Sequence, residues 1–79
     1  MKYTTYIIKG DEGYYKGFTN NIERRLSEHK KGRTKSTKKL HNIKLIYKEE
    51  YDNFTSARQR EIYLKSAAGR KFIQNKLKI

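Results

Sequence analysis

Short apolar segments in the first part of the chain predict a hairpin of two β-strands. Residues 2–9 are rich in Tyr, Thr and Ile, which favour the pleated surface of a sheet. They are followed at residues 10–13 by Gly-Asp-Glu-Gly, a sequence with strong turn chemistry. A second strand is then expected over residues 14–18.

The length of this turn determines which side chains of the two strands share a face. With residues 10–13 as the connection, Tyr6 lies opposite Gly17 and Ile8 lies opposite Tyr15. Tyr6 and Tyr15 are then diagonal neighbours on one face. Because Gly17 has no side chain, the register also predicts open space opposite Tyr6, where a ligand or another backbone can approach closely.

Residues 21–31 have the pattern of a short helix. Asn20 followed three residues later by Glu23 resembles a capping box. At 100° per residue, His29 falls on the apolar stripe of this helix and Arg25 lies along its edge, so both are expected to point inward. The apolar residues that define the stripe are Ile22 and Leu26.

The second half of the chain predicts one more strand and two more helices. Residues 43–51 alternate loosely between apolar and polar side chains, as a strand does. An Asp-Asn pair then opens a helix over residues 54–66, and Gly69 breaks the pattern before a short third helix at residues 70–77. The buried face of the middle helix is expected to carry Phe54, Ala57, Leu64 and Ala68. The order strand, strand, helix, strand, helix, helix predicts an α+β fold, with a small antiparallel sheet flanked by helices.

Length and charge narrow the function. Seventy-nine residues predict one domain, residues 1–79, with a small core. Lys and Arg number 20 against 8 acids, which gives a net charge of +12. A nucleic acid is the expected partner, although a ribosomal or membrane-surface role would account for the same charge. The absence of Cys excludes a disulfide framework, a thiolate zinc site and a thiol nucleophile. No apolar run suits a signal peptide or a membrane span, so a cytoplasmic protein with no membrane partner is expected.

Glu61 is the most informative single residue. It is the only acid after Asp52, and it lies where the helical pattern calls for an apolar side chain. A carboxylate turned toward a small core is costly unless a cation or a metal accompanies it. Two interpretations stay open: a partly buried salt bridge to a neighbouring Lys or Arg, and a ligand for one hard divalent cation such as Mg²⁺.

Four other residues supply the group types that phosphodiester hydrolysis needs besides a metal. Arg25 suits a phosphate because its guanidinium stays charged and is planar. Tyr6 or Tyr15 can act as the base only if its pKa falls well below the usual value of about 10, and the sequence does not decide between them. His29 can accept a proton or orient a tyrosine hydroxyl. The plainer alternative is that both tyrosines are core rings and that His29 completes the apolar stripe.

Residues 30–39 predict a polar, cationic loop, since six of the ten are basic and none is acidic. Such a loop is usually only solvated. Next to the candidate site we expect it to contact the backbone of a nucleic acid, with its Ser and Thr hydroxyls adding phosphate hydrogen bonds. The expected nucleic-acid-binding residues are Lys30, Lys31, Arg33, Lys35, Lys38 and Lys39.

Three motifs in this order resemble the GIY-YIG nuclease family, and the remainder of the chain, including residues 44–47 and 57–65, resembles its small single-domain bacterial members. The motifs are Thr4-Thr5-Tyr6, Tyr15-Lys16-Gly17 and the segment from Asn20 to His29. The resemblance extends over nearly the whole chain. It implies a three-stranded antiparallel sheet with helices around it and a single-metal nuclease site on the sheet. By position it assigns site roles to Tyr6, Tyr15, Gly17, Arg25 and His29, and metal binding to Glu61.

The motifs also depart from the family pattern. Thr4 and Thr5 replace the Gly and Ile of the first motif, and Lys16 replaces the Ile of the second. Some members carry a lysine just after the second motif that helps to activate a tyrosine, but this chain has Phe18 there, and Lys16 is expected on the opposite sheet face.

The sequence therefore predicts an endonuclease that hydrolyses DNA phosphodiester bonds. Mg²⁺ or Mn²⁺ would lie on Glu61 and the scissile phosphate on Arg25, with Tyr6 or Tyr15 positioning or deprotonating water. The alternative is a basic nucleic-acid-binding module that keeps the fold and cuts nothing. A partner protein that supplies targeting is compatible with either prediction.

Overall fold

The computed structural model describes residues 2–78, apart from the side chain of Ser36. Its elements are β1 (Tyr3–Gly10), β2 (Gly13–Thr19), α1 (Ile22–Lys30), the 3₁₀ helix η1 (Lys35–Thr37), β3 (Lys44–Tyr51), α2 (Phe54–Lys65) and α3 (Ala67–Leu77). The predicted order and the α+β class are confirmed. The one added element is η1, a short turn of helix within the basic loop.

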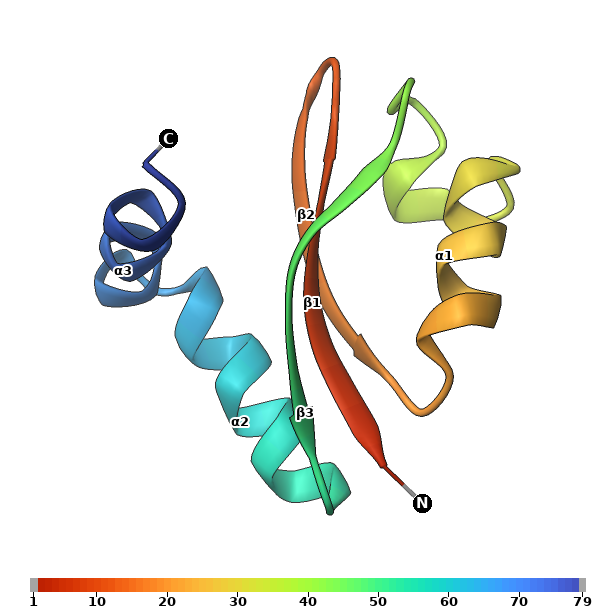
Figure 1. Cartoon of the computed structure of the whole chain (residues 1–79). Helices are drawn as coiled ribbons and strands as arrows, with labels where there is room; N and C mark the ends of the chain where they lie inside the picture. The colour runs from red at the N-terminus through yellow and green to blue at the C-terminus, as the bar shows by residue number, and fades with distance from the viewer. Residues whose placement is uncertain (1, 79) are drawn as a thin grey trace.

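The three strands form one antiparallel sheet in the order β2-β1-β3. The predicted hairpin register is confirmed, because Tyr6 pairs with Gly17 and Ile8 pairs with Tyr15. In Figure 1 the sheet separates α1 and the basic loop from α2 and α3. Within the described part of the chain, none of the helices has the length and apolarity that crossing a membrane requires.

Strand β1 lies in the centre of the sheet and supplies side chains to both layers, because successive residues of a strand point to opposite faces. Tyr6 and Ile8 pack with Ile43 on the α1 side. Ile7 packs with Leu64 and Ile73 under α2 and α3. The core therefore consists of two small clusters that share one strand.

Asparagine caps begin two of the helices. The Asn21 side chain accepts the backbone N–H of Arg24 at 3.1 Å, so α1 begins at Ile22. The expected capping box starting at Asn20 is therefore wrong by one residue. The Asn53 side chain caps α2 by accepting the backbone N–H of Ser56 at 2.8 Å.

The corner between α2 and α3 differs from the prediction. Helix α2 ends at Lys65, and Ser66 caps α3, which begins at Ala67 and runs through Gly69. A Cβ at Gly69 would lie 1.9 Å from the carbonyl oxygen of Tyr63, so the glycine permits close packing of the two helices. Gly69 is thus a contact point inside a helix and does not break one.

The buried face of α2 is also only partly as expected. Ala57 and Leu64 are fully buried, and Thr5 of β1 donates its hydroxyl to the carbonyl of Ala57 at 2.8 Å. Phe54 is 53% exposed, because it lies in the first turn and packs edge-on against Phe18 of β2 and Tyr3 of β1. Ala68 is exposed and belongs to α3, since the chain turns at Ser66.

Candidate active site

Side chains from β1, β2 and α1 meet on the α1 side of the sheet. The Tyr6 hydroxyl lies 2.8 Å from Nε2 of His29, and both residues are 1% exposed. The ring of Tyr15 lies 5.0 Å from that of His29 and 6.3 Å from that of Tyr6, measured between centroids. The hairpin register and the helical stripe thus bring these three rings together.

Gly17 makes this cluster possible. A Cβ at this position would lie 2.8 Å from the hydroxyl of Tyr6 and 2.9 Å from the ring of Tyr15. The space expected to be open for a ligand is therefore filled by the two tyrosines, and that expectation is wrong. The missing side chain lets the Tyr6 hydroxyl cross the β2 backbone and reach His29.

Thr37 of η1 completes a buried chain of hydrogen bonds. Its hydroxyl lies 2.6 Å from Nδ1 of His29, on the opposite side of the imidazole from Tyr6. Thr37 is 1% exposed. For the Thr37 hydroxyl the sequence predicted only a phosphate contact, because the spacing of Thr37 from His29 in a loop gives no sign of this hydrogen bond.

Burial lowers the pKa of His29, and the positive charge of Arg25 lowers it further. The imidazole is therefore neutral at neutral pH, and one of its nitrogens is an acceptor.

Arg25 lies at the edge of the cluster and remains charged. Its guanidinium donates to Oε1 of Glu28 at 3.2 Å, and about a third of its side chain is exposed. Burial opposes the charge, but interactions with Tyr6 and Glu28 outweigh this effect and raise the pKa of Arg25. A partly exposed guanidinium beside a buried phenol is well placed to receive an anion from solvent.

The pKa of Tyr6 is raised to about 12. Burial is the main cause, and it outweighs the lowering effect of Arg25. The negative charge of Glu61 contributes to the increase as a minor cause. This direction is opposite to the one that a simple tyrosine base requires, so Tyr6 is a neutral phenol at neutral pH.

Glu61 extends from α2, which lies on the other side of the sheet from α1 (Figure 1). Its side chain is 7% exposed, and it forms ion pairs with Arg58 and, at 3.2 Å, with Lys65. The salt-bridge interpretation is therefore confirmed. The ion pairs of Glu61 lie within its own helix, and its link to Tyr6 is electrostatic.

A single carboxylate limits the kind of metal that this site fits. Among residues 2–78, no three His, Cys, Asp or Glu side chains are grouped as a metal site. Mg²⁺ nevertheless commonly binds one or two carboxylates and completes its shell with waters and phosphate oxygens. Glu61 fits such an ion if the ion replaces Arg58 or Lys65 at the carboxylate oxygens, or binds the carboxylate beside them.

The basic loop lies on the same side of the sheet as α1 (Figure 1). Its six cationic residues are all exposed, and within the described structure none of them is in an ion pair with an acid. Thr34 and Thr37 are buried, so the expectation that these two hydroxyls contact phosphate is wrong. The contact between Thr37 and His29 instead attaches the loop to the tyrosine cluster.

The second motif has Lys16 on the opposite sheet face, as expected. Its Nζ donates to the carbonyl of Leu64 in α2 at 2.8 Å. Phe18, at the place of the activating lysine, packs against Phe54 with ring centroids 5.1 Å apart. The Tyr6 hydroxyl is instead bonded to His29, and the charge that lowers its pKa is that of Arg25.

Comparisons with known proteins agree on one family. Residues 2–77 match the family described as the GIY-YIG catalytic domain. A UPF0213 protein of Clostridium perfringens is 42% identical over 62 residues, which cover 76% of this chain and 67% of that protein. A UPF0213 protein of Limosilactobacillus reuteri is 38% identical over 68 residues, covering 81% and 71% of the two chains.

A solved structure supports the same relationship. The solution NMR structure of a UPF0213 protein from Bacillus halodurans is similar to this chain with a TM-score of 0.58 and 26% sequence identity. The similarity covers 94% of this chain and 81% of that one.

Proposed function

Because the chain belongs to the GIY-YIG family of nucleases, we propose that it is a metal-dependent endonuclease that hydrolyses DNA phosphodiester bonds. The observation that supports this proposal best is the buried chain of hydrogen bonds from Tyr6 through His29 to Thr37, with Arg25 beside it. A buried, hydrogen-bonded phenol–imidazole pair can transfer a proton. Packing of the core alone does not require such a pair of polar side chains.

The proton route follows from the charge states of the two groups. With Nδ1–H of His29 donating to the Thr37 hydroxyl, Nε2 is free to accept the O–H of Tyr6. The phenolic oxygen then accepts a proton from the attacking water while its own proton passes to Nε2. The water oxygen forms a bond to phosphorus, and the bond between phosphorus and the leaving oxygen breaks. The leaving oxygen takes up a proton from solvent, and His29 returns its extra proton to solvent.

Tyr6 never becomes a free phenolate in this route, so its raised pKa is compatible with a role as proton relay. Burial and the charge of Arg25 disfavour the imidazolium that forms at His29, so the route requires the negative charge developing on the phosphate to stabilise it.

Arg25 is proposed to bind the scissile phosphate. Its planar guanidinium is suited to two phosphate oxygens, and its position beside Tyr6 places the phosphate next to the relay. Tyr15, which packs on the His29 ring, is proposed to hold the imidazole in place and to border the water site.

Glu61 is proposed to hold a divalent cation, Mg²⁺ or Mn²⁺. Such an ion, when bound, stabilises negative charge on phosphate and leaving-group oxygens. Arg58 and Lys65, which balance the carboxylate in this structure, would then be available to the nucleic acid backbone. The exposed cations of the basic loop would add contacts that do not depend on sequence.

The test is nicking of plasmid and branched DNA with Mg²⁺ by purified protein. We expect Arg25→Ala and Glu61→Gln each to lower the rate by about 100-fold or more, the size expected when a stabiliser of transition-state charge is removed. Arg24→Ala is the matched control, because it removes the same charge from an exposed neighbouring position of α1. Full activity in both site variants would show that the site is assigned wrongly.

The second candidate is a basic module that binds nucleic acid without cutting it. The raised pKa of Tyr6 and the ion pairs of Glu61 favour this alternative, because they describe a resting site in which neither base nor metal ligand is activated. Binding that weakens steeply with salt, together with no cleavage in Mg²⁺ or Mn²⁺, would identify it.

A further inference from the structure

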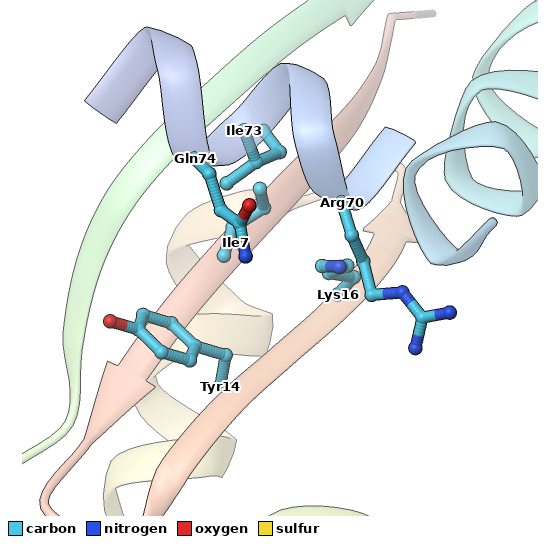
Figure 2. A pocket seen from close by; sticks show the side chains of 6 residues that line it. All are labelled: Ile7, Tyr14, Lys16, Arg70, Ile73 and Gln74. Carbon is cyan, nitrogen blue, oxygen red and sulfur yellow. The ribbon is translucent and has the colours of Figure 1, made fainter. Parts of the chain in front are cut away.

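A separate cavity lies on the other side of the sheet, between α3 and the β1–β2 hairpin (Figure 2). It has a volume of about 200 Å³. Its lining consists of Ile7, Tyr14, Lys16, Arg70, Ile73 and Gln74. Strand residues of this face alternate with those of the Tyr6 cluster, so the sheet separates the cavity from that cluster. Glu61 extends from α2 on the same side of the sheet as the cavity (Figure 1), but it does not line the cavity.

The cavity has an apolar floor and an aromatic edge. Ile7 and Ile73 form the floor and are 0% and 3% exposed. Tyr14 stands at the side of the cavity, and the residue is 46% exposed (Figure 2). A flat apolar ring fits this combination, because it can cover the isoleucines and pack against the phenol.

Two cations lie at the end of the cavity away from Tyr14 (Figure 2). Lys16 donates to the carbonyl of Leu64, which occupies one of the three N–H donors of its ammonium group. Burial lowers the pKa of Lys16, and the charges of Arg70 and Lys65 lower it further. Lys65 forms an ion pair with Glu61, which balances its charge.

The charges at this end are not balanced by acids. The lining contains no Asp or Glu, and within residues 2–78 neither Lys16 nor Arg70 forms an ion pair. Like charges held close together destabilise each other, and an anion bound between them removes that repulsion. The end near Arg70 is therefore complementary to a phosphate or a similar anion.

We propose that this cavity binds one nucleotide unit, with its base over Ile7 and Ile73 against Tyr14 and its phosphate on Lys16 and Arg70. Cavities for drug-sized ligands are larger, about 300–1,000 Å³, so this one accommodates a single ring system. Gln74 projects from α3 over the floor and offers an amide donor and acceptor to the edge of a base (Figure 2). The site is independent of the cleavage chemistry proposed above, because it uses none of the same side chains.

The test is an NMR titration of the ¹⁵N-labelled full chain with adenosine monophosphate and, separately, with a single-stranded DNA of five adenines. We expect the largest shifts at Tyr14, Lys16 and Gln74. Arg70→Gln should weaken binding by about tenfold or more, as expected for one charge-assisted hydrogen bond. Lys71→Gln, which removes the same charge from an exposed position of the same helix, should change it less than about twofold.

The two ligands identify the source of the nucleotide. Equal affinities indicate a free mononucleotide, and tighter binding of the oligomer indicates a strand that passes the cavity. A second variant, Tyr14→Ala, should weaken both ligands through loss of stacking and leave the fold intact, because the residue is half exposed. Shifts confined to residues 30–39 and α1, or equal weakening by the two charge variants, would overturn the proposal.

Discussion

Replacing Tyr6 with Phe tests the proton relay with the smallest change to the structure. The substitution removes only the hydroxyl, and the ring keeps its place in a core where Tyr6 is 1% exposed. It removes the 2.8 Å hydrogen bond to His29 and leaves Nε2 buried without that partner. A buried polar atom left unsatisfied destabilises a protein by about 1–3 kcal/mol.

The effect on folding can be separated from the effect on chemistry. A protein of 79 residues has a free energy of unfolding of about 4–12 kcal/mol. Even the lowest stability combined with the largest loss leaves about 1 kcal/mol, which keeps about 80% of the molecules folded at 25 °C. Unfolding therefore cannot reduce activity by more than about 1.3-fold under these conditions.

A proton-transfer residue contributes about 100- to 10,000-fold to a rate, so Tyr6→Phe should lower the nicking rate by that amount. Urea unfolding measured on the same preparation gives the stability. Tyr51→Phe is the matched control, because it also removes a phenolic hydrogen bond, the 2.5 Å contact with Glu49 on β3. Tyr51 pairs with Tyr3 and therefore lies on the opposite face of the sheet from Tyr6. Tyr6→Phe protein that is folded and cuts at the same rate as the Tyr51→Phe control refutes the relay.

Three further predictions concern the packing and charge of the site. Gly17→Ala should abolish nicking but keep the far-UV circular dichroism, because its Cβ would lie 2.8 Å from the Tyr6 hydroxyl; an unchanged rate contradicts this. Gly69→Ala should lower the free energy of unfolding by about 1–3 kcal/mol, because the added methyl group would collide with the backbone of Tyr63. This loss should outweigh the higher helix propensity of alanine. Increased stability in urea would show instead that α2 and α3 can move apart to accommodate the methyl group. In NMR titrations His29 should titrate below 6.5, because of burial, and His41 above it, because of its hydrogen-bonded carboxylate. As pH falls below 6.5, His29 is protonated first in the unfolded chain, so this residue lowers the stability of the folded protein at acidic pH. His41 has the opposite effect, because the stabilisation that it provides when protonated is lost as pH rises through its folded pKa.

Local sequence signals located most of the elements. The turn at residues 10–13 fixed the hairpin register, because side chains of a strand alternate with a period of two and one wrong residue would reverse every face. The helical period then directed His29 inward, where it is 1% exposed. Burial of Glu61 was predicted in the same way, from an acid in an apolar stripe.

The contacts between elements were decided only by the tertiary structure. Thr37 reaches His29 through a loop whose path no periodicity describes. Gly69 was expected to end a helix, since glycine lowers helix propensity, but its close contact with α2 outweighs that small effect. The raised pKa of Tyr6 depends on burial and on the distances to Arg25, Tyr15 and Glu61, which are three-dimensional quantities. The sequence by itself thus determined which residues face inward, because facing depends on local periodicity, and only the folded chain decided which of them touch and in what charge state.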